Sequence, residues 1–116
     1  MNKIIHIIDD DRDILTLLQL FFKKKGFHVI TDYNGDNLDT SVQPCPGVYL
    51  IDINLAGKNG IDLCKLIKKE CRDVPVMLMS ANTDLIIMAK DCDADAFVAK
   101  PFDMYKVLST VNALVA

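Results

Sequence analysis

The fold of this chain is decided by residues 4–31, which read IIHIIDDDRDILTLLQLFFKKKGFHVIT. Ile4–Ile8 is short and apolar apart from His6, which is typical of a strand that is covered on both faces. Asp11–Lys25 has apolar residues at spacings of three and four, the period of a helix with one buried face. The predicted buried stripe consists of Ile14, Leu17, Leu18, Phe21 and Phe22.

The end of this helix leads directly into a second strand. Lys23–Lys25 complement the negative end of the helix dipole, and Gly26 can cap the helix. Phe27–Thr31 is a second short strand, and Asn34-Gly35 then favours a turn. A strand, a helix and a strand in succession predict a parallel pair joined by a right-handed crossover.

The same alternation continues to the end of the chain. Further strands are predicted at Gly47–Ile51, Pro75–Met79 and Ala96–Ala99, and further helices at Ile61–Cys71, Thr83–Asp91 and Phe102–Leu114, with a weak, short helix at Asp36–Val42 and a loop at Asn54–Gly60. The inward residues of two of these helices are Leu63, Cys64, Ile67 and Cys71 in one, and Met104, Val107, Leu108, Val111 and Leu114 in the other. The pattern predicts a doubly wound (βα)5 fold of the α/β class, with helices on both faces of a five-stranded parallel sheet.

The composition is that of one globular domain, which we expect to span residues 1–116. The hydrophobic fraction of 51% excludes a disordered chain, and the net charge of −3 argues against nucleic-acid binding by this domain. The four cysteines form no C-x-x-C pair, so reduced, buried thiols are expected rather than a zinc site.

The N-terminal segment carries no targeting signal in this interpretation. Its apolar run stops at Asp9–Asp11, too early for a signal peptide, and no run approaches the ~20 apolar residues that span a bilayer. We therefore expect no membrane association, and the cytoplasm as the compartment.

Charged and polar residues follow the predicted strands where each one ends. Asp9–Asp11 follow the first strand, Asp52 the third, Ser80 the fourth and Lys100 the fifth. Because the carboxyl ends of parallel strands meet at one edge of the sheet, these side chains are expected to lie together. Close carboxylates repel one another, and a hard cation such as Mg²⁺ relieves that repulsion.

The charges of such a site balance. Asp9, Asp10 and Asp52 supply three negative charges, which Lys100 and one Mg²⁺ together neutralise. A carboxylate in this setting can accept a phosphoryl group, whose equatorial oxygens the metal and the ammonium stabilise.

Four segments carry a resemblance to a known family. They are residues 7–11 (IIDDD), 50–60 (LIDINLAGKNG), 75–81 (PVMLMSA) and 96–102 (AFVAKPF). In this order and spacing they resemble the receiver domain of two-component response regulators over essentially the whole chain. The resemblance implies a chemotaxis-regulator-like, flavodoxin-like sheet with the strand order 2-1-3-4-5.

The resemblance also implies roles for individual residues. Asp52 would accept a phosphoryl group from a phosphohistidine, as a signalling switch more than an enzyme. Asp9 and Asp10 would hold Mg²⁺ together with Asp52, Asp10 being the more direct ligand. The backbone carbonyl of Asn54 would complete the metal shell.

A second set of implied roles concerns switching. Lys100, which precedes a Pro101 similar to the cis-proline of the family, would bind the phosphate. Ser80 would follow the phosphate on activation, and Phe97 would change rotamer with it. This sequence departs from the family pattern at Phe97, where tyrosine is commoner, at Ala56, which replaces proline, and at Asp93, which replaces glycine.

The implied partners are a histidine kinase or histidine phosphotransfer protein and an output surface. That surface is the face of the fourth helix, fifth strand and fifth helix, which would serve a homodimer or an effector. Helical spacing in the fourth helix directs one face, with Leu85, Met88, Ala89 and Cys92, to the sheet. The same spacing directs Ile87 to solvent, where it would belong to a patch that continues onto the fifth strand and fifth helix through Phe97 and Tyr105.

Alternatives stay open at this point. The three acids could be a helix N-terminal cluster, with Asp11 as the cap. The chain could also be a phospho-independent interaction module with a receiver fold, which the intact Asp52, Ser80 and Lys100 argue against. A haloacid-dehalogenase-type phosphatase would need an acid where Asn54 stands, and a flavodoxin-like electron carrier would need a Ser/Thr-rich loop after the first strand.

Overall fold

The computed structural model describes residues 2–36, 38, 45–55, 57–82, 84, 87 and 89–116, with the backbone alone at position 91. The main sheet consists of β1 (Ile4–Ile8), β2 (His28–Asp32), β3 (Val48–Asp52), β6 (Val76–Ser80) and β7 (Ala96–Ala99). The helices are α1 (Arg12–Lys24), α2 (Gly60–Glu70) and α4 (Met104–Val115), with a 3₁₀ turn, η1, at Ala89–Cys92. A small antiparallel ladder pairs β4 (Asn54–Leu55) with β5 (Lys58–Asn59).

The main sheet is parallel throughout, in the order β2-β1-β3-β6-β7. Counting the five main strands alone, this is the predicted order 2-1-3-4-5, and the doubly wound α/β fold is confirmed. In the register, Ile8 lies opposite Ile51, so the residues that follow each strand emerge side by side. Ser80 lies opposite Ala99 at the same edge.

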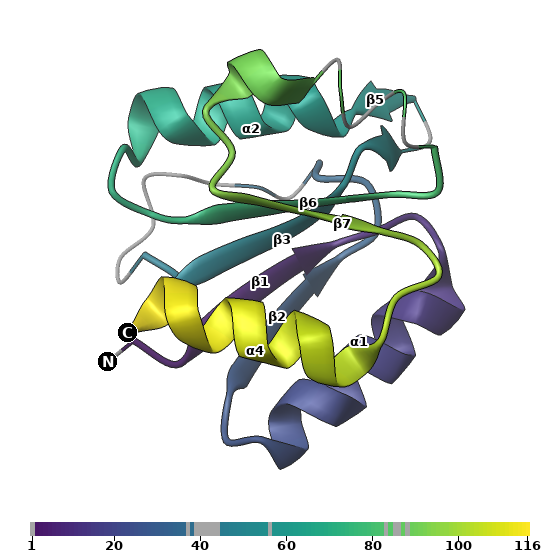
Figure 1. Ribbon diagram of the computed structural model, residues 1–116, viewed down its shortest axis with the longest axis vertical. Coiled ribbons are helices and arrows are strands. Elements are labelled where there is room, and N and C mark those ends of the chain that lie inside the picture. The colour runs from purple at the N-terminus through teal and green to yellow at the C-terminus, as the bar shows by residue number, and fades with distance from the viewer. Residues whose placement is uncertain are drawn as a thin grey trace.

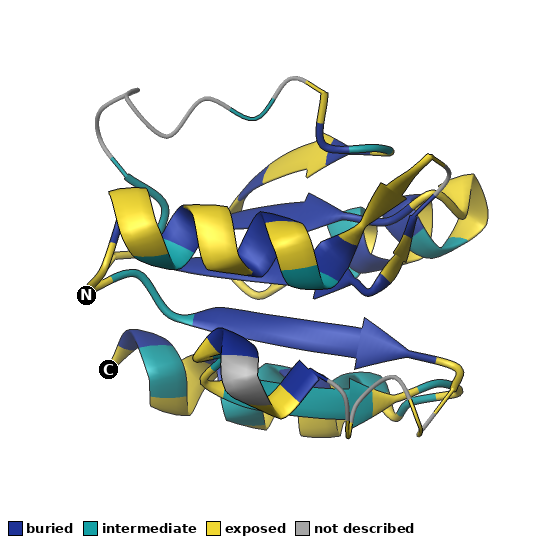
Figure 2. Cartoon of the chain, turned by 90° about the horizontal axis from the view of Figure 1, so that it is seen from above, coloured by how far each residue is buried: buried dark blue, intermediate teal, exposed yellow. Residues whose placement is uncertain are grey.

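Helices cover both faces of the sheet (Figure 1). One core lies beneath α1 and α4 and contains Ile5 and Ile7, whereas the other lies beneath α2 and η1 and contains Ile8. This division follows from the pleat, because successive strand residues point to opposite faces. Figure 2 shows the consequence: the central strands β1, β3 and β6 are buried, the edge strands β2 and β7 are more exposed, and the helices expose their outer sides.

The buried face of α1 differs from the prediction. Asp11 is its N-cap, as one interpretation of the acidic run expected, and accepts from the backbone N–H groups of Asp13 and Ile14. The buried residues are Leu15, Leu18 and Phe22, whereas Leu17 is 60% exposed. The predicted place of Leu17 in the core is therefore wrong. α1 has apolar residues on more than one face, so period alone leaves open which stripe meets the sheet.

The other differences concern element ends. The second, third and fourth main strands begin one residue later than predicted, and the 54–60 loop contains the β4–β5 ladder. The last helix begins two residues later than predicted and continues to Val115, and the end of the predicted helix 83–91 is the 3₁₀ turn η1. The four inward residues predicted for α2 are buried, as are Ala89 and Cys92. Of the predicted helix 36–42, only positions 36 and 38 are described. Within the predicted helix 83–91, positions 83, 85, 86 and 88 lie outside the described residues, so the predictions for Leu85 and Met88 do as well. Within the described part of the chain, no helix is both long and apolar enough to cross a membrane.

Candidate functional site

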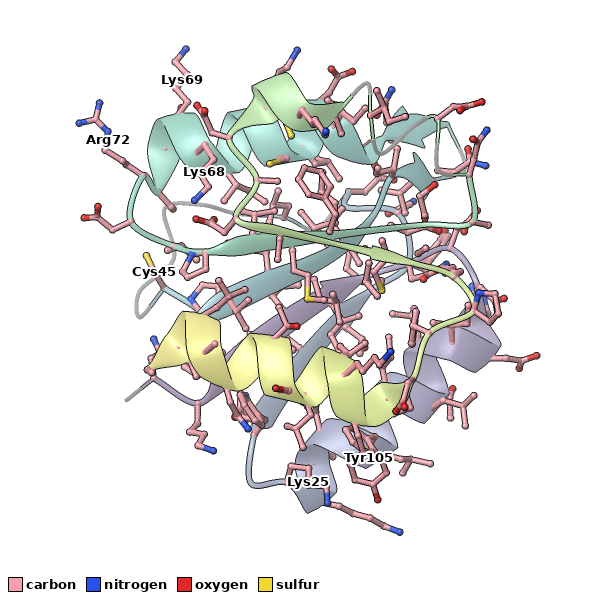
Figure 3. The ribbon with its side chains drawn as sticks, viewed as in Figure 1. Lys25, Cys45, Lys68, Lys69, Arg72 and Tyr105 are labelled. Atoms are coloured by element: carbon pink, nitrogen blue, oxygen red, sulfur yellow. The ribbon has the colours of Figure 1, made fainter. Side chains whose placement is uncertain are left out.

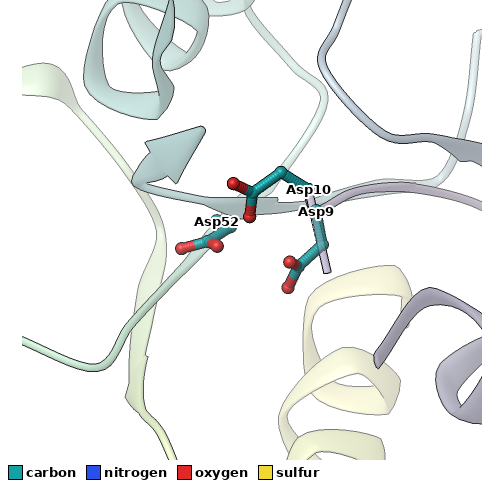
Figure 4. Close-up of side chains that lie close together, drawn as sticks. All are labelled: Asp9, Asp10 and Asp52. Atoms are coloured by element: carbon teal, nitrogen blue, oxygen red, sulfur yellow. The ribbon is translucent and has the colours of Figure 1, made fainter. Parts of the chain in front are cut away.

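The three carboxylates predicted for the site converge at the carboxyl edge of the sheet. Asp9 follows β1 directly, Asp10 comes next, and Asp52 is the last residue of β3. Each offers an oxygen, and these oxygens all lie within 4.8 Å of one another (Figure 4). Sequence positions 43 residues apart are thus joined in one acidic cluster by the parallel pairing of β1 with β3.

Lys100 reaches this cluster from the end of the edge strand β7. Its backbone N–H donates to the carbonyl oxygen of Ser80 at 2.8 Å, which fixes the residue just beyond β7. Its Nζ then donates to Oδ2 of Asp9 at 2.8 Å and to Oδ2 of Asp52 at 3.2 Å. The peptide bond to Pro101 is cis. One ammonium therefore bridges two carboxylates that would otherwise face each other unpaired.

The carboxylates differ in how freely they can take a ligand. Asp9 is fully buried, and both of its oxygens are engaged, Oδ1 by the backbone N–H of Asp11 at 2.9 Å and Oδ2 by Lys100. Asp10 is exposed. Asp52 is buried, and it too accepts at both oxygens, from the N–H of Asn54 at Oδ1 and from Lys100 at Oδ2, each at 3.2 Å. Asp10 and Asp52 line the cavity described next, whereas Asp9 does not, so these two are the carboxylates that an incoming group meets first.

These residues surround a cavity of about 300 Å³. The polar residues in its lining are Asp10, Asp11, Asp52, Asn54, Ser80, Asn82 and Lys100. Asp9 lies beneath this lining as the support of Lys100. The cavity is large enough to hold a small anion and water against the carboxylate of Asp52.

A glycine lets α2 begin directly against the site. The backbone N–H of Gly60 donates to the carbonyl oxygen of Ile53 at 2.7 Å. A Cβ at position 60 would collide with the backbone carbonyl of Asp52 and with Ile53. Only glycine permits this approach, and the approach holds the end of β3 in place. Sequence analysis missed this role, although the Asn59-Gly60 pair was a signal of special backbone geometry.

The site shifts the acidity of its charged groups. Burial, and next the charge of Asp9, raise the pKa of Asp52 to about 6, although Lys100 partly offsets them. For Lys100, burial alone would lower the pKa, but its hydrogen bonds and ion pairs with Asp9 and Asp52 outweigh it and raise the pKa. Lys100 is therefore held in its charged form, whereas the ionised form of the Asp52 carboxylate is less favourable than that of an ordinary aspartate.

Replacing Asp52 with Asn is expected to stabilise the metal-free protein at neutral and alkaline pH. The folded pKa of about 6 lies above the ordinary value of 3.8, so ionisation of Asp52 opposes folding, and stability is lost as the pH rises between these values. The variant should gain on the order of 2 kcal/mol at about pH 8 and nothing at about pH 4.

Urea unfolding in a chelator measures this gain at both pH values. The exposed Asp73→Asn provides the control for loss of one negative charge. A gain in stability for Asp52→Asn that is the same at both pH values would show that ionisation of Asp52 is not what destabilises the wild type.

Ser80 and Phe97 lie near the site in different ways. Ser80 is buried, and its Oγ donates to the carbonyl of Asn82 at 3.0 Å and accepts from its N–H at 2.9 Å. The hydroxyl is thus engaged with the loop after β6, and Asn82 is a partner that sequence analysis missed. Phe97 is half-buried on β7, packs against the α2-side core and does not line the cavity.

Comparisons with known proteins agree with this arrangement. The family model described as the response regulator receiver domain matches residues 5–112. The N-terminal receiver domain of a two-component response regulator from Bacteroides fragilis is 34% identical, with a TM-score of 0.86 over 97% of this chain and 96% of that one. The receiver domain of a Francisella response regulator is 26% identical, with a TM-score of 0.86 over 98% and 97% of the two chains.

A more distant structure shares the fold. A Burkholderia pseudomallei response regulator, solved with a phosphorylated aspartic acid, a calcium ion and citrate, is 19% identical, with a TM-score of 0.86 over 98% of this chain and 69% of that one. The family match covers almost the whole chain, and the Bacteroides fragilis domain is similar over nearly its full length. This protein therefore belongs to the response regulator receiver domain family of two-component signalling.

Proposed function

We propose that Asp52 is the residue of this receiver domain that accepts the phosphoryl group. The observation that carries the proposal is the position of its carboxylate, which lines the cavity while Lys100 holds Oδ2 and the Asn54 N–H holds Oδ1. In the proposed step an oxygen of Asp52 attacks the phosphorus of a phosphohistidine. The new P–O bond forms as the P–N bond breaks, and the released imidazole takes a proton from water.

The chain's own groups favour this transfer by electrostatics and position. Lys100 presents its ammonium next to the attacked phosphorus and can pair with an oxygen of the transferred group. Asp9 keeps that ammonium in place, because it is buried and bonded to it. Each chain accepts one phosphoryl group and supplies groups that assist its own phosphorylation and dephosphorylation, so the proposed role is that of a signalling switch more than of an enzyme.

The acidic cluster fits a divalent cation, and we propose Mg²⁺. Asp10 and Asp52 would hold it, with the backbone carbonyl of Asn54 and with Asp9 supporting the arrangement from beneath. Their hard oxygen donors, gathered within 4.8 Å, are of the kind that Mg²⁺ prefers. A bound Mg²⁺ would neutralise charge on the carboxylates and on the phosphoryl oxygens.

Ser80 and Phe97 are proposed as the residues that report phosphorylation. The Ser80 hydroxyl can leave its bonds to Asn82 and donate to a phosphoryl oxygen on Asp52, since both residues line one cavity. Phe97 lies opposite Leu78 on the neighbouring strand, two residues before Ser80, so a shift of the β6 end can change its packing.

An apolar groove beside the cavity is proposed as the docking site of the phosphohistidine donor. The groove has a volume of about 560 Å³ and contains Ile14, Leu17, Pro101, Phe102 and Met104. It shares Ile14, Ala81 and Lys100 with the acidic cavity, so the two are continuous. A donor helix lying in the groove would therefore place its phosphohistidine at Asp52. This gives a reason for the exposure of Leu17.

Leu17→Lys is expected to slow phosphotransfer from a protein donor about 10-fold or more. Docking would bury Leu17, and burying one leucine contributes about 1.5–3 kcal/mol. Labelling by a small phosphodonor should be unchanged, because a small molecule needs no docking surface. The measurement compares both rates, using any phosphohistidine protein that transfers to the wild type.

Leu66→Lys on α2 is the matched control, since Leu66 is also an exposed leucine on a helix but lies outside the groove. Equal slowing in both variants, or wild-type transfer to Leu17→Lys, would remove the groove from the proposal.

The output surface is proposed at Ile87, β7 and α4. Ile87 is 62% exposed, as expected, and Tyr105 is 66% exposed. The ring of Tyr105 also packs edge-on against Phe21, with the ring centroids 5.6 Å apart, and the Lys25 ammonium lies 5.4 Å from the Tyr105 ring centroid. Tyr105 therefore borders α1 as well (Figure 3). Exposed apolar side chains of this size suit a homodimer or an effector protein.

Ile87→Lys is expected to weaken self-association or effector binding while leaving the melting temperature and Asp52 phosphorylation nearly unchanged. The side chain is exposed, so its replacement removes apolar contact area from the surface and nothing from the core. Sedimentation of the phosphorylated protein, alone and with effector, measures the change. Association equal to that of the wild type would exclude Ile87 from the surface.

The proposed function as a whole is tested by labelling the wild type with acetyl phosphate. With Mg²⁺ present, one acid-stable, base-labile phosphoryl group per chain is expected, and without Mg²⁺ almost none. Labelling on histidine or serine would contradict the mechanism, and absence of labelling would favour a phospho-independent interaction module.

A further inference from the structure

The cysteines of this chain gather in pairs on the α2 side of the sheet. Cys64, Cys71 and Cys92 belong to the core beneath α2, and Cys45 packs against that core from the segment before β3. Cys64 pairs with Cys92, and its Sγ donates to the Cys92 carbonyl oxygen at 3.4 Å. Cys45 and Cys71 form the second pair, because Cys45 packs against the core that contains Cys71 and its thiol acts on the Cys71 thiol at close range. No disulfide joins any of the four in this structure.

The backbone holds both members of the Cys45–Cys71 pair in place. The side-chain amide of Asn2 donates to the carbonyl oxygen of Cys45 at 2.8 Å. The N–H of Cys71 donates to the carbonyl of Ile67 at 2.6 Å, and its carbonyl accepts from Val74 at 3.0 Å. Hydrogen bonds to the backbone of each cysteine therefore fix its position, independently of any bond between the thiols.

The two thiols differ in access to solvent. Cys45 is half-buried, whereas Cys71 belongs to the buried core. Figure 3 shows Cys45 at the side of the molecule where both chain termini lie in Figure 1, away from the carboxyl ends of the strands. Burial, and next the neighbouring Cys45 thiol, raise the pKa of Cys71. A soluble oxidant therefore reaches the Cys45 thiol before it reaches the more deeply buried Cys71 thiol.

We propose that Cys45 and Cys71 form a reversible disulfide when the protein meets hydrogen peroxide. The Cys45 thiolate attacks one peroxide oxygen, the O–O bond breaks, and the leaving hydroxide takes a proton to become water. The resulting sulfenic acid is attacked by the Cys71 thiol, so the S–S bond forms and a second water leaves. The two thiols lose two electrons in total, and the peroxide gains them.

The disulfide would clamp the end of α2 to the segment before β3. It closes a loop of residues 45–71, which contains β3 and α2, at the end of the sheet opposite the acidic cavity. Closing a loop restricts the unfolded chain, so the oxidised protein should melt about 5–10 °C higher than the reduced protein. This clamp does not depend on phosphorylation of Asp52.

Peptide mapping of the wild type tests the disulfide directly. Trypsin places every cysteine in a different peptide, because a lysine or arginine separates each from the next, and Cys71 lies in the tripeptide Glu70–Arg72. After treatment with equimolar peroxide and digestion without reductant, the expected product joins this tripeptide to the peptide of Cys45. Dithiothreitol should restore both peptides and lower the melting temperature again.

The second pair is the internal control. Cys64 and Cys92 are both buried, so their peptides should stay reduced. Cys45→Ser should lose both the linked peptide and the rise in melting temperature, and it replaces a half-exposed side chain, so it should fold. Over-oxidation of Cys45 without linkage, a Cys64–Cys92 bond, or a bond between two chains would overturn the proposal. A confirmed disulfide with an unchanged melting temperature would overturn the clamp.

Discussion

Asp52→Asn is expected to lose all phosphorylation by acetyl phosphate, while the wild type takes up one phosphoryl group. The amide keeps the size of the carboxylate but lacks the negative oxygen that attacks phosphorus. The other cavity groups stay in place, because Lys100 keeps its 2.8 Å bond to Asp9. Intact-mass spectrometry before and after base treatment measures the label, and base should remove it from the wild type.

Two features make this test specific. Asp73→Asn, an exposed residue outside the cavity, should be labelled like the wild type. Asp52→Asn is also expected to be the more stable protein without metal, so loss of its label could not be attributed to unfolding. Labelling of Asp52→Asn at the wild-type level would move the acceptor to another residue.

Mg²⁺ is expected to stabilise the folded protein strongly. Only the folded chain gathers the three carboxylates, so the cation binds that state in preference to the unfolded chain. At a hundred times its dissociation constant, the gain in unfolding free energy should be about 2.7 kcal/mol. Thermal or urea unfolding over a Mg²⁺ titration measures this gain.

Asp10→Asn is expected to abolish most of this stabilisation. Asp10 is exposed, so the variant should fold, and it removes one negative ligand from the cluster. Without metal the variant should be at least as stable as the wild type, because one repulsive charge is gone. Asp73→Asn should keep the full response to Mg²⁺. An unchanged response in Asp10→Asn would refute the assignment of the metal site.

The order of elements and the site could be predicted because both follow from local patterns. Short β-branched strands that alternate with amphipathic helices permit few topologies, and in a parallel sheet the residues after each strand share one edge. Asp9, Asp52 and Lys100 could therefore be brought together from their places after strands alone. The inward residues of α2 were also predictable, because Leu63, Cys64 and Ile67 recur at helical spacing.

Other features depend on contacts between distant segments, which no local pattern specifies. The apolar residues of α1 allow more than one buried face, and only packing on the sheet buries Leu15 and exposes Leu17. The different environments of Asp9 and Asp10 also depend on tertiary contacts. These two residues are neighbours in sequence, but Asp9 bonds to Lys100 whereas Asp10 faces the cavity. The contact of Cys45 with Cys71 likewise arises only when α2 packs over β3. Sequence by itself determined which elements form and which residues end the strands, because these follow from short-range periodicity. Tertiary structure alone decided which side chains those residues meet, because burial and pairing depend on the whole fold.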